Sequence, residues 1–196
     1  GVTQMALSAV DVALWDIKAK AAEMPLWKLL GGSGSKRVEA YNTDGGWLNW
    51  YKQQLVDSAR QTVDAGFYGV KLKIGSLDPH DDLDRIEAVR DAIGPRVNLM
   101  VDANAAWDLP KAILIGRRFV DYDVYWFEEP LSADDVESHA RLAQAIQTPI
   151  ALGESLYTVT AFRHFLTAGA VHFVQPDAIR VGGITPFWQV ADLTAA

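Results

Sequence analysis

The sequence predicts an α/β fold in which helices cover parallel strands, and three observations support this class. From residue 38 onward, short runs rich in Val, Ile, Leu and Tyr alternate with longer amphipathic stretches. The short runs are too apolar for a sheet with one face in water, which is typical of parallel strands buried on both faces. From the second run onward, each ends at an ionisable residue, and these residues follow one another at spacings of 23–29.

The first part of the chain has a different pattern. Between residues 3 and 22, apolar side chains such as Met5 and Ile17 recur at helical spacing and predict an amphipathic helix that packs against the rest of the protein. A short helical turn and a loop rich in Gly and Ser follow. We therefore expect residues 1–35 to form a helical lead-in and residues 36–196 to form the main domain.

The main domain is expected to contain about six strand-helix units. Its strands are predicted near residues 38–43, 69–74, 98–103, 124–128, 149–153 and 171–176, with helices in the gaps. Two architectures fit this alternation, a closed barrel and an open doubly wound sheet.

The ionisable residues at the strand ends distinguish the two architectures. They are Lys73, Asp102, Glu128, Glu154 and Asp177. The carboxyl ends of barrel strands form one rim, whereas an open sheet would spread the same residues along a line. Because a shared rim explains the repeated placement, we expect a TIM-like (β/α) barrel.

Three of these residues are carboxylates on consecutive strands. Asp102, Glu128 and Glu154 would repel one another at close range unless a cation compensated their charge. A ligand set of oxygen atoms favours magnesium, a hard ion that can keep coordination positions for water or a substrate oxygen. The alternative, that each acid is a solvated loop residue, is disfavoured by three matched strand ends.

Lys71 and Lys73 lie two residues apart and therefore share one face of their strand. Burial of one ammonium near another and near a metal lowers its pKa, which makes a lysine a base at neutral pH. The alternative is an edge strand with two solvated lysines. The carboxylates that follow along the chain favour the catalytic interpretation.

The composition excludes several classes of function. A formal net charge of -7 and a pI near 5.0 disfavour binding to nucleic acid or to anionic membranes. The absence of cysteine excludes disulfides, thiolate metal sites and a thiol nucleophile, and indicates a cytoplasmic protein. We expect a small-molecule partner, no nucleic acid and no membrane.

Five short motifs resemble those of the mandelate racemase subgroup of the enolase superfamily, within the mandelate racemase/muconate lactonizing enzyme family. They are Lys-Leu-Lys at 71–73, Val-Asp-Ala-Asn at 101–104, Trp-Phe-Glu-Glu-Pro at 126–130, Gly-Glu at 153–154 and Gln-Pro-Asp at 175–177. Residues 6–18 resemble the helix that precedes the barrel in that family. Residues 41–47 and 176–184 most resemble sugar-acid dehydratases that act on galactarate or talarate.

The resemblance implies a role for each matching residue. The implied magnesium ligands are Asp102, Glu128 and Glu154, the implied catalytic residues are Lys73 and Asp177, and the implied substrate contacts are Lys71 and Asn104. Lys73 is implied to be the general base. Asp177 is implied to orient a histidine on the following strand, which this sequence does not contain. The choice of Glu128 over Glu129 as the ligand comes from the motif alone.

The implied reaction is magnesium-dependent removal of the proton α to a carboxylate, which gives a metal-stabilised enediolate. Dehydration of a sugar acid such as galactarate or talarate, a hydro-lyase reaction, is the expected outcome. Racemisation, epimerisation and cycloisomerisation start from the same intermediate and remain alternatives. A non-catalytic barrel subunit is an alternative of another class, and a metal-dependent aldolase is disfavoured because it offers the lysine pair no role.

The resemblance also implies parts that lie outside this sequence. The family has a (β/α)7β barrel with a capping domain before it, so we expect residues 1–35 to lead from that domain into a barrel that is incomplete at its C-terminal end. We expect the complete enzyme to be a homo-oligomer. The histidines are poor substitutes for the missing one, because His80, His139 and His164 are expected at the surface and His172 begins its strand.

Overall fold

The computed structural model describes residues 1–34 and 37–195 and divides into two compact units. The sheet unit comprises Glu39–Leu152 and Ala168–Phe173, and the helical unit comprises Gly1–Val38, Gly153–Thr167 and Val174–Ala196. The predicted domain boundary between residues 35 and 36, and the predicted end at residue 196, lie outside the described residues. Among the described helices, none has both the length and the apolar character needed to cross a membrane.

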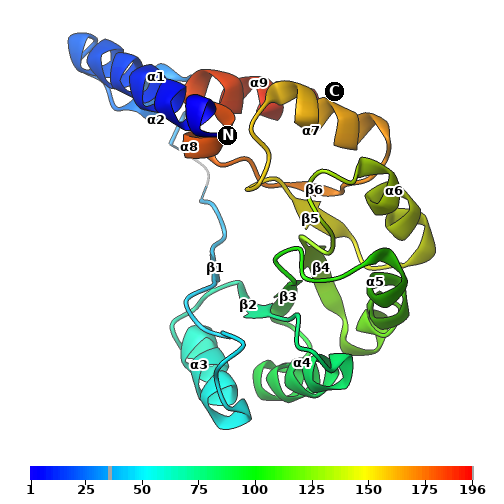
Figure 1. Cartoon of the computed structure of the whole chain (residues 1–196). Helices are drawn as coiled ribbons and strands as arrows, with labels where there is room; N and C mark the ends of the chain where they lie inside the picture. Colours follow the sequence, from blue (N-terminus) through cyan, green and yellow to red (C-terminus); the bar gives the residue numbers. More distant parts are fainter. Residues whose placement is uncertain (35–36, 196) are drawn as a thin grey trace. The chain divides into compact units, whose positions relative to one another are not determined.

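Within residues 37–195, six strands follow one another in chain order across one sheet (Figure 1). The strands are β1 (Tyr41–Asn42), β2 (Gly69–Lys73), β3 (Asn98–Asp102), β4 (Val124–Glu128), β5 (Ile150–Leu152) and β6 (Phe173–Val174). The pairs from β1–β2 to β4–β5 are parallel. An order that never reverses is that of a (β/α) barrel, because a doubly wound sheet reverses its strand order at a switch point. The predicted α/β barrel class is therefore confirmed, with each observed strand inside its predicted range.

The sheet unit joins its strands through helices. These are α3 (Lys52–Asp64), α4 (Pro79–Ile93), α5 (Leu109–Gly116), the 3-10 helix η1 (Phe119–Tyr122) and α6 (Val136–Ala145). Asp78, Asp108 and Asp135 cap the first turns of α4, α5 and α6 with their side chains. Because an aspartate cap satisfies free N–H groups at a helix start, these residues fix where each helix begins after its strand.

Both faces of the sheet are buried, as the apolar strands predict. Leu99, Met100 and Val101 of β3 are completely buried. On one face Met100 packs with Trp126 and Ala151, and partly buried aromatic rings extend this cluster: Tyr41, Tyr125 and Phe173. Met100 and Trp126 lie two residues before Asp102 and Glu128. Because side chains two positions apart share a face, this aromatic cluster lies on the same face as the charged residues at the strand ends.

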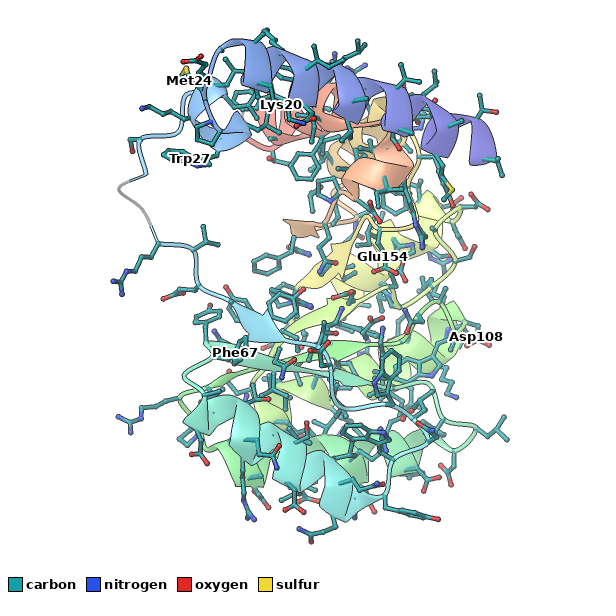
Figure 2. All side chains as sticks on the ribbon, turned by 90° about the vertical axis from the view of Figure 1, so that its left-hand side faces the viewer. Lys20, Met24, Trp27, Phe67, Asp108 and Glu154 are labelled. Carbon is teal, nitrogen blue, oxygen red and sulfur yellow. The ribbon has the colours of Figure 1, made fainter. Side chains whose placement is uncertain are left out.

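The helical unit consists of short helices around one long one. They are α1 (Val2–Ala21), α2 (Leu26–Leu29), α7 (Val159–Thr167), α8 (Ala178–Val181) and α9 (Ile184–Ala195). The predicted helix over residues 3–22 is confirmed as α1. Figure 2 labels Lys20 in α1, Met24 after it and Trp27 in α2.

The expected packing face of α1 is wrong. Met5 is 41% exposed and Ile17 is 62% exposed. Polar groups take part in its contacts, since Thr185 at the start of α9 accepts from the Trp15 indole and donates to Asp11. Apolar residues lie on more than one side of α1, so helical spacing could not identify the side that faces its neighbours.

Candidate active site

Four of the predicted site residues meet at the carboxyl ends of neighbouring strands in the sheet unit. Lys73, Asp102 and Glu128 end β2, β3 and β4 and lie side by side in the strand register. Lys71 lies two residues before Lys73 on β2. Because side chains alternate along a strand, all four share one face of the sheet.

Their side chains form one network of ion pairs. The Lys71 ammonium donates to Glu128 Oε1 at 2.5 Å and lies 3.2 Å from Asp102 Oδ2, and the Lys73 ammonium donates to the same Oδ2 at 2.6 Å. The Asp102 side chain is fully buried, that of Lys71 is 7% exposed and that of Lys73 is 15% exposed. Buried charges of this kind persist only when partners compensate them, as each does here.

The ion pairs favour the charged forms of Asp102 and Lys71. Burial favours a higher pKa for Asp102, but the charge of Lys71, the hydrogen bond from Lys73 and the backbone N–H of Asn104 outweigh it, and the pKa is lowered. Burial likewise favours a lower pKa for Lys71, but the charges of Glu128 and Asp102 raise it.

Trp126 is a site residue that the sequence analysis missed. Its indole N–H donates to Glu128 Oε2 at 3.1 Å, so each carboxylate oxygen of Glu128 accepts a hydrogen bond. Trp126 also packs against Tyr41 at a ring-centroid distance of 5.2 Å. The signal in the sequence was its position two residues before Glu128, which places both side chains on the same face.

The loops after β3 and β4 are strained and joined to each other. Asn104, Ala105 and Glu129 have positive φ angles of 43°, 60° and 40°. The Ala105 N–H donates to the Glu129 carbonyl at 2.8 Å, and the Glu129 N–H donates to the Ala151 carbonyl at 3.0 Å. Left-handed backbone of this kind costs of order 1–3 kcal/mol per residue and clusters at functional sites.

These loops also separate the roles of neighbouring residues. Asn104 is exposed, as a substrate contact requires, and its amide N–H donates to Glu129 Oε2 at 3.5 Å. Glu129 is buried and directed toward Asn104, whereas Glu128 is directed into the lysine network. The two adjacent glutamates therefore have different partners, and the choice of Glu128 as the metal ligand stays a prediction.

Glu154 and Asp177 belong to the helical unit. Glu154 follows β5 and is half-buried (Figure 2). Asp177 caps α8, where its Oδ1 accepts from the Ile179 N–H at 2.6 Å. Within the described residues, no three His, Asp or Glu side chains are gathered closely enough to hold a metal ion. A site shared by Glu154, Asp102 and Glu128 stays a prediction.

The histidines follow the expectation in part. His80 and His164 are exposed, and His172 precedes β6, where its Nδ1 accepts from the Ile150 N–H at 3.0 Å. His139 is completely buried, so its predicted surface position is wrong. It lies on the inner side of the amphipathic helix α6, with its Nδ1 2.8 Å from the Asp135 carbonyl.

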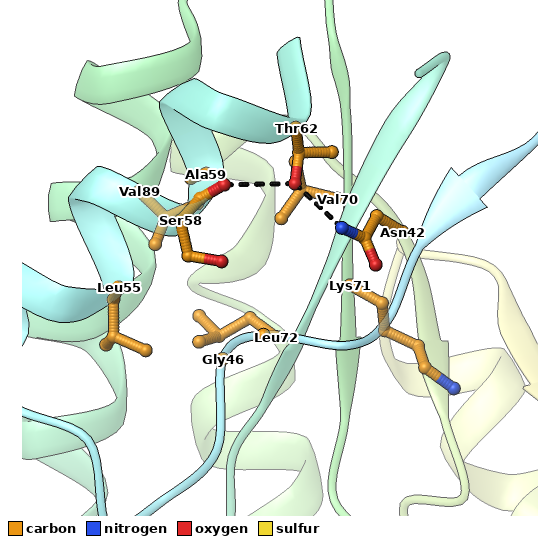
Figure 3. Close-up of a pocket in the computed structure, with 11 residues that line it drawn as sticks. Asn42, Gly46, Leu55, Ser58, Ala59, Thr62, Val70, Lys71, Leu72 and Val89 are labelled. Atoms are coloured by element: carbon orange, nitrogen blue, oxygen red, sulfur yellow. Dashed lines mark hydrogen bonds between the residues drawn. The ribbon is translucent and has the colours of Figure 1, made fainter. Parts of the chain in front are cut away.

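A small cavity lies behind the site, between α3 and β2 (Figure 3). Asn42 donates to the Thr62 hydroxyl at 3.0 Å, and that hydroxyl donates to the Ser58 carbonyl. The Lys71 side chain extends away from this polar pair (Figure 3). A volume of about 10 Å³ accommodates at most one water molecule, so this cavity is too small for a substrate.

Comparisons with known proteins agree with the motifs. The family model for the enolase C-terminal domain-like fold matches residues 54–196, and that for the mandelate racemase/muconate lactonizing enzyme N-terminal domain matches residues 1–31. The L-talarate/galactarate dehydratase of Salmonella typhimurium is 45% identical over 195 residues, which cover 100% of this chain and 49% of that protein. The 3,6-anhydro-α-L-galactonate cycloisomerase of Streptomyces coelicolor is 38% identical over 196 residues, which cover 100% and 54%.

Solved structures give the same result. The crystal structure of L-talarate dehydratase from Polaromonas sp. JS666, complexed with Mg and L-glucarate, matches with a TM-score of 0.92 and 45% identity. The match covers 100% of this chain and 54% of that one. The chain thus spans about half the length of the curated relatives it matches.

Proposed function

Because the chain belongs to the mandelate racemase/muconate lactonizing enzyme family of the enolase superfamily, we propose that the complete protein removes the proton beside a carboxylate of a sugar acid. An acid then protonates the β-hydroxyl, which leaves as water, and the remaining enol tautomerises to a keto-deoxy acid, which makes the protein a dehydratase. The observation that carries the proposal is the buried network of Lys71, Lys73, Asp102 and Glu128 at adjacent strand ends. Active sites of barrel enzymes lie at this end of the strands.

The residues of the site suit magnesium. Asp102 and Glu128 offer buried carboxylate oxygens in adjacent register, and hard oxygen ligands are what this ion prefers. We propose that Glu154 completes the set, as in the family motif, and the relative from Polaromonas contains Mg. Magnesium, when bound, supplies positive charge that stabilises the charge developing on the substrate carboxylate.

The two lysines are proposed to have different roles. Lys73 is the more exposed of the two and is proposed as the base that takes the α-proton. Lys71 lies deeper between Glu128 and Asp102, so it holds these carboxylates in place and presents positive charge toward the substrate. Asn104 is proposed to donate its amide to a substrate oxygen, and Asp177 to orient a histidine of the complete protein.

Related reactions remain the second candidates for the same site. Racemisation, epimerisation and cycloisomerisation begin with the same proton removal, and a cycloisomerase is among the relatives. A non-catalytic subunit is disfavoured because both lysines and the carboxylates of the sheet unit are present and paired. We propose residues 1–35 as the lead-in from a capping domain and residues 36–196 as part of the barrel domain. Homo-oligomer formation stays a prediction.

The test uses the complete protein and a panel of acid sugars in deuterated water, with magnesium or with a chelator. A keto product from galactarate or talarate that requires magnesium is the expected result. Deuterium at the α-carbon without a keto product would favour racemisation or epimerisation. If no substrate in the panel gave either a keto product or deuterium at the α-carbon, the dehydratase proposal would be refuted and the non-catalytic subunit would be supported.

A further inference from the structure

Helix α4 carries two buried charged residues that the site described above does not include. Asp82 is completely buried and Arg85 is 8% exposed. They lie three residues apart in the first half of the helix, so they occupy the same side of it. Residues of these types on a helix are usually solvated, and their burial calls for a structural or functional reason.

Arg85 binds backbone carbonyl groups in two places, the segment that follows β1 and the end of β2. Its guanidinium donates to the carbonyls of Trp47 at 2.9 Å, Trp50 at 3.0 Å and Gly46 at 3.2 Å, in the segment after β1. It also donates to the Lys73 carbonyl at 3.4 Å, at the end of β2. The planar guanidinium has donors in several directions, which a lysine could not reproduce.

Asp82 holds the segment on the other side of Lys73. Its Oδ2 accepts from the N–H groups of Gly75 at 3.0 Å and Ser76 at 2.9 Å, and its Oδ1 accepts from the Ser76 hydroxyl at 2.8 Å. Asp82 and Arg85 thus bind, from one helix, the segment that precedes α3 and the segment that follows β2.

The segment held by Arg85 reaches the proposed base. The Lys73 N–H donates to the Gly46 carbonyl at 3.0 Å, and the Lys73 ammonium lies 5.9 Å from the centre of a Trp47 ring. Gly46 has a φ of 78°, and a Cβ there would lie 3.0 Å from Leu72 Cα. The backbone therefore approaches β2 closely at this point.

We propose that Arg85 is a positioning residue, which holds residues 46–50 against the end of β2 so that Trp47 stays beside the Lys73 ammonium. The consequence for catalysis rests on the proposed function, because it takes Lys73 as the base. The positioning itself does not depend on that role. Arg85 acts through the backbone of the segment, so its loss should loosen the segment while the strand ends keep their ion pairs.

Arg90 provides a matched control on the same helix. Its guanidinium donates to the carbonyls of Tyr122, Gly94, Val97 and Asp123, toward the opposite end of α4. Arg85→Met and Arg90→Met in the complete protein therefore remove the same kind of side chain, with the same kind of contact, at two different places.

Hydrogen exchange without substrate tests the positioning. Arg85→Met should raise the exchange rate of the Lys73 amide and of the amides of residues 46–50 by about tenfold or more, because these groups open locally. Arg90→Met should leave those rates unchanged and raise exchange near residues 94–97. If Arg85→Met does not fold, Arg85→Lys should show a smaller increase at the same amides. The inference would be overturned if the exchange rate of the Lys73 amide rose no more in the Arg85 variants than in Arg90→Met.

Kinetics test the consequence for catalysis. Arg85→Met should lower kcat for α-proton exchange by about tenfold, with KM changed by less than about threefold, because a misplaced base affects the chemical step. Arg90→Met should keep kcat within about twofold. A protein without any α-proton exchange would refute the proposed function, whereas the hydrogen-exchange result would still decide the role of Arg85. Unchanged kcat in Arg85→Met would overturn the link to Lys73.

Discussion

At the scale of single residues, the positive charge of Lys71 allows two buried carboxylates to lie next to each other. Its ammonium contacts both Glu128 and Asp102, and the carboxylates raise its pKa in return. The two carboxylates therefore keep the lysine charged, and the charge of Lys71 helps to lower the pKa of Asp102.

Lys71→Met should destabilise the metal-free protein by about 3–5 kcal/mol, because it leaves buried charges without their partner. Lys20→Met is the control. Lys20 pairs with Asp16 at the surface, where the two side chains are 75% and 57% exposed, so its loss should change stability by less than about 1 kcal/mol. Urea unfolding in chelator measures both. Equal small losses would show that Lys71 does not hold the carboxylates.

Trp126→Phe tests the hydrogen bond to Glu128 while keeping an aromatic ring in the cluster with Tyr41. Magnesium affinity should fall by about 10- to 100-fold, the usual effect of removing a hydrogen bond that orients a metal ligand. Calorimetric titration of the complete protein gives the affinity. Trp107→Phe is the control, because Trp107 packs against Phe119 and Phe127 instead. An equal loss of affinity in both variants would contradict the role of Trp126.

At the scale of elements, the glycine after β1 determines how closely the first loop approaches β2. Gly46→Ala should cost more than Gly66→Ala. Both glycines have positive φ angles, of 78° and 82°, but a Cβ at position 46 meets Leu72 and Lys71, whereas one at position 66 meets open space. Gly66→Ala should lose about 1 kcal/mol from backbone strain, and Gly46→Ala about 1–3 kcal/mol more from displacement of the loop. Chemical denaturation measures the difference, and equal losses would contradict close packing of the loop.

His139 should make the stability of α6 depend on pH. Burial lowers its pKa, although the carbonyl and charge of Asp135 act in the opposite direction. As pH falls below the unfolded value of about 6.5, the unfolded chain binds more protons than the folded one, so the free energy of unfolding decreases. His139→Gln should flatten this decrease below about pH 6.5. His164→Gln, at an exposed position, should leave it as in the wild type. An unchanged slope in His139→Gln would refute the prediction.

Elements were more predictable than contacts. The strands followed from apolar runs, and Lys73, Asp102 and Glu128 followed from the repeat of one charged residue per strand end. Periodicity did not identify the outward faces of α1, because that helix is apolar on several sides. Arg85 was missed because a charged residue on an amphipathic helix resembles a solvated one. Its role depends on carbonyl groups 35–39 residues away in the chain.

At the scale of the whole molecule, both units belong to the same family, so we expect their residues to act in one enzyme. Matches cover the chain from end to end, while the chain covers about half of its relatives. Lys71, Lys73, Asp102 and Glu128 lie in the sheet unit, and Glu154 and Asp177 lie in the helical unit. We propose that these residues divide into a proton-transfer group, which includes Lys73, and a metal-binding group, which includes Asp102.

The most direct test compares Lys73→Ala with Asp102→Asn in the complete protein. Deuterium uptake at the α-carbon of a sugar acid and magnesium affinity by calorimetry are measured on both variants. Lys73→Ala should abolish exchange on the face that Lys73 serves and keep magnesium affinity within about tenfold of the wild type. Asp102→Asn should weaken magnesium binding and exchange together. Loss of magnesium binding in Lys73→Ala, with deuterium uptake preserved, would contradict the account.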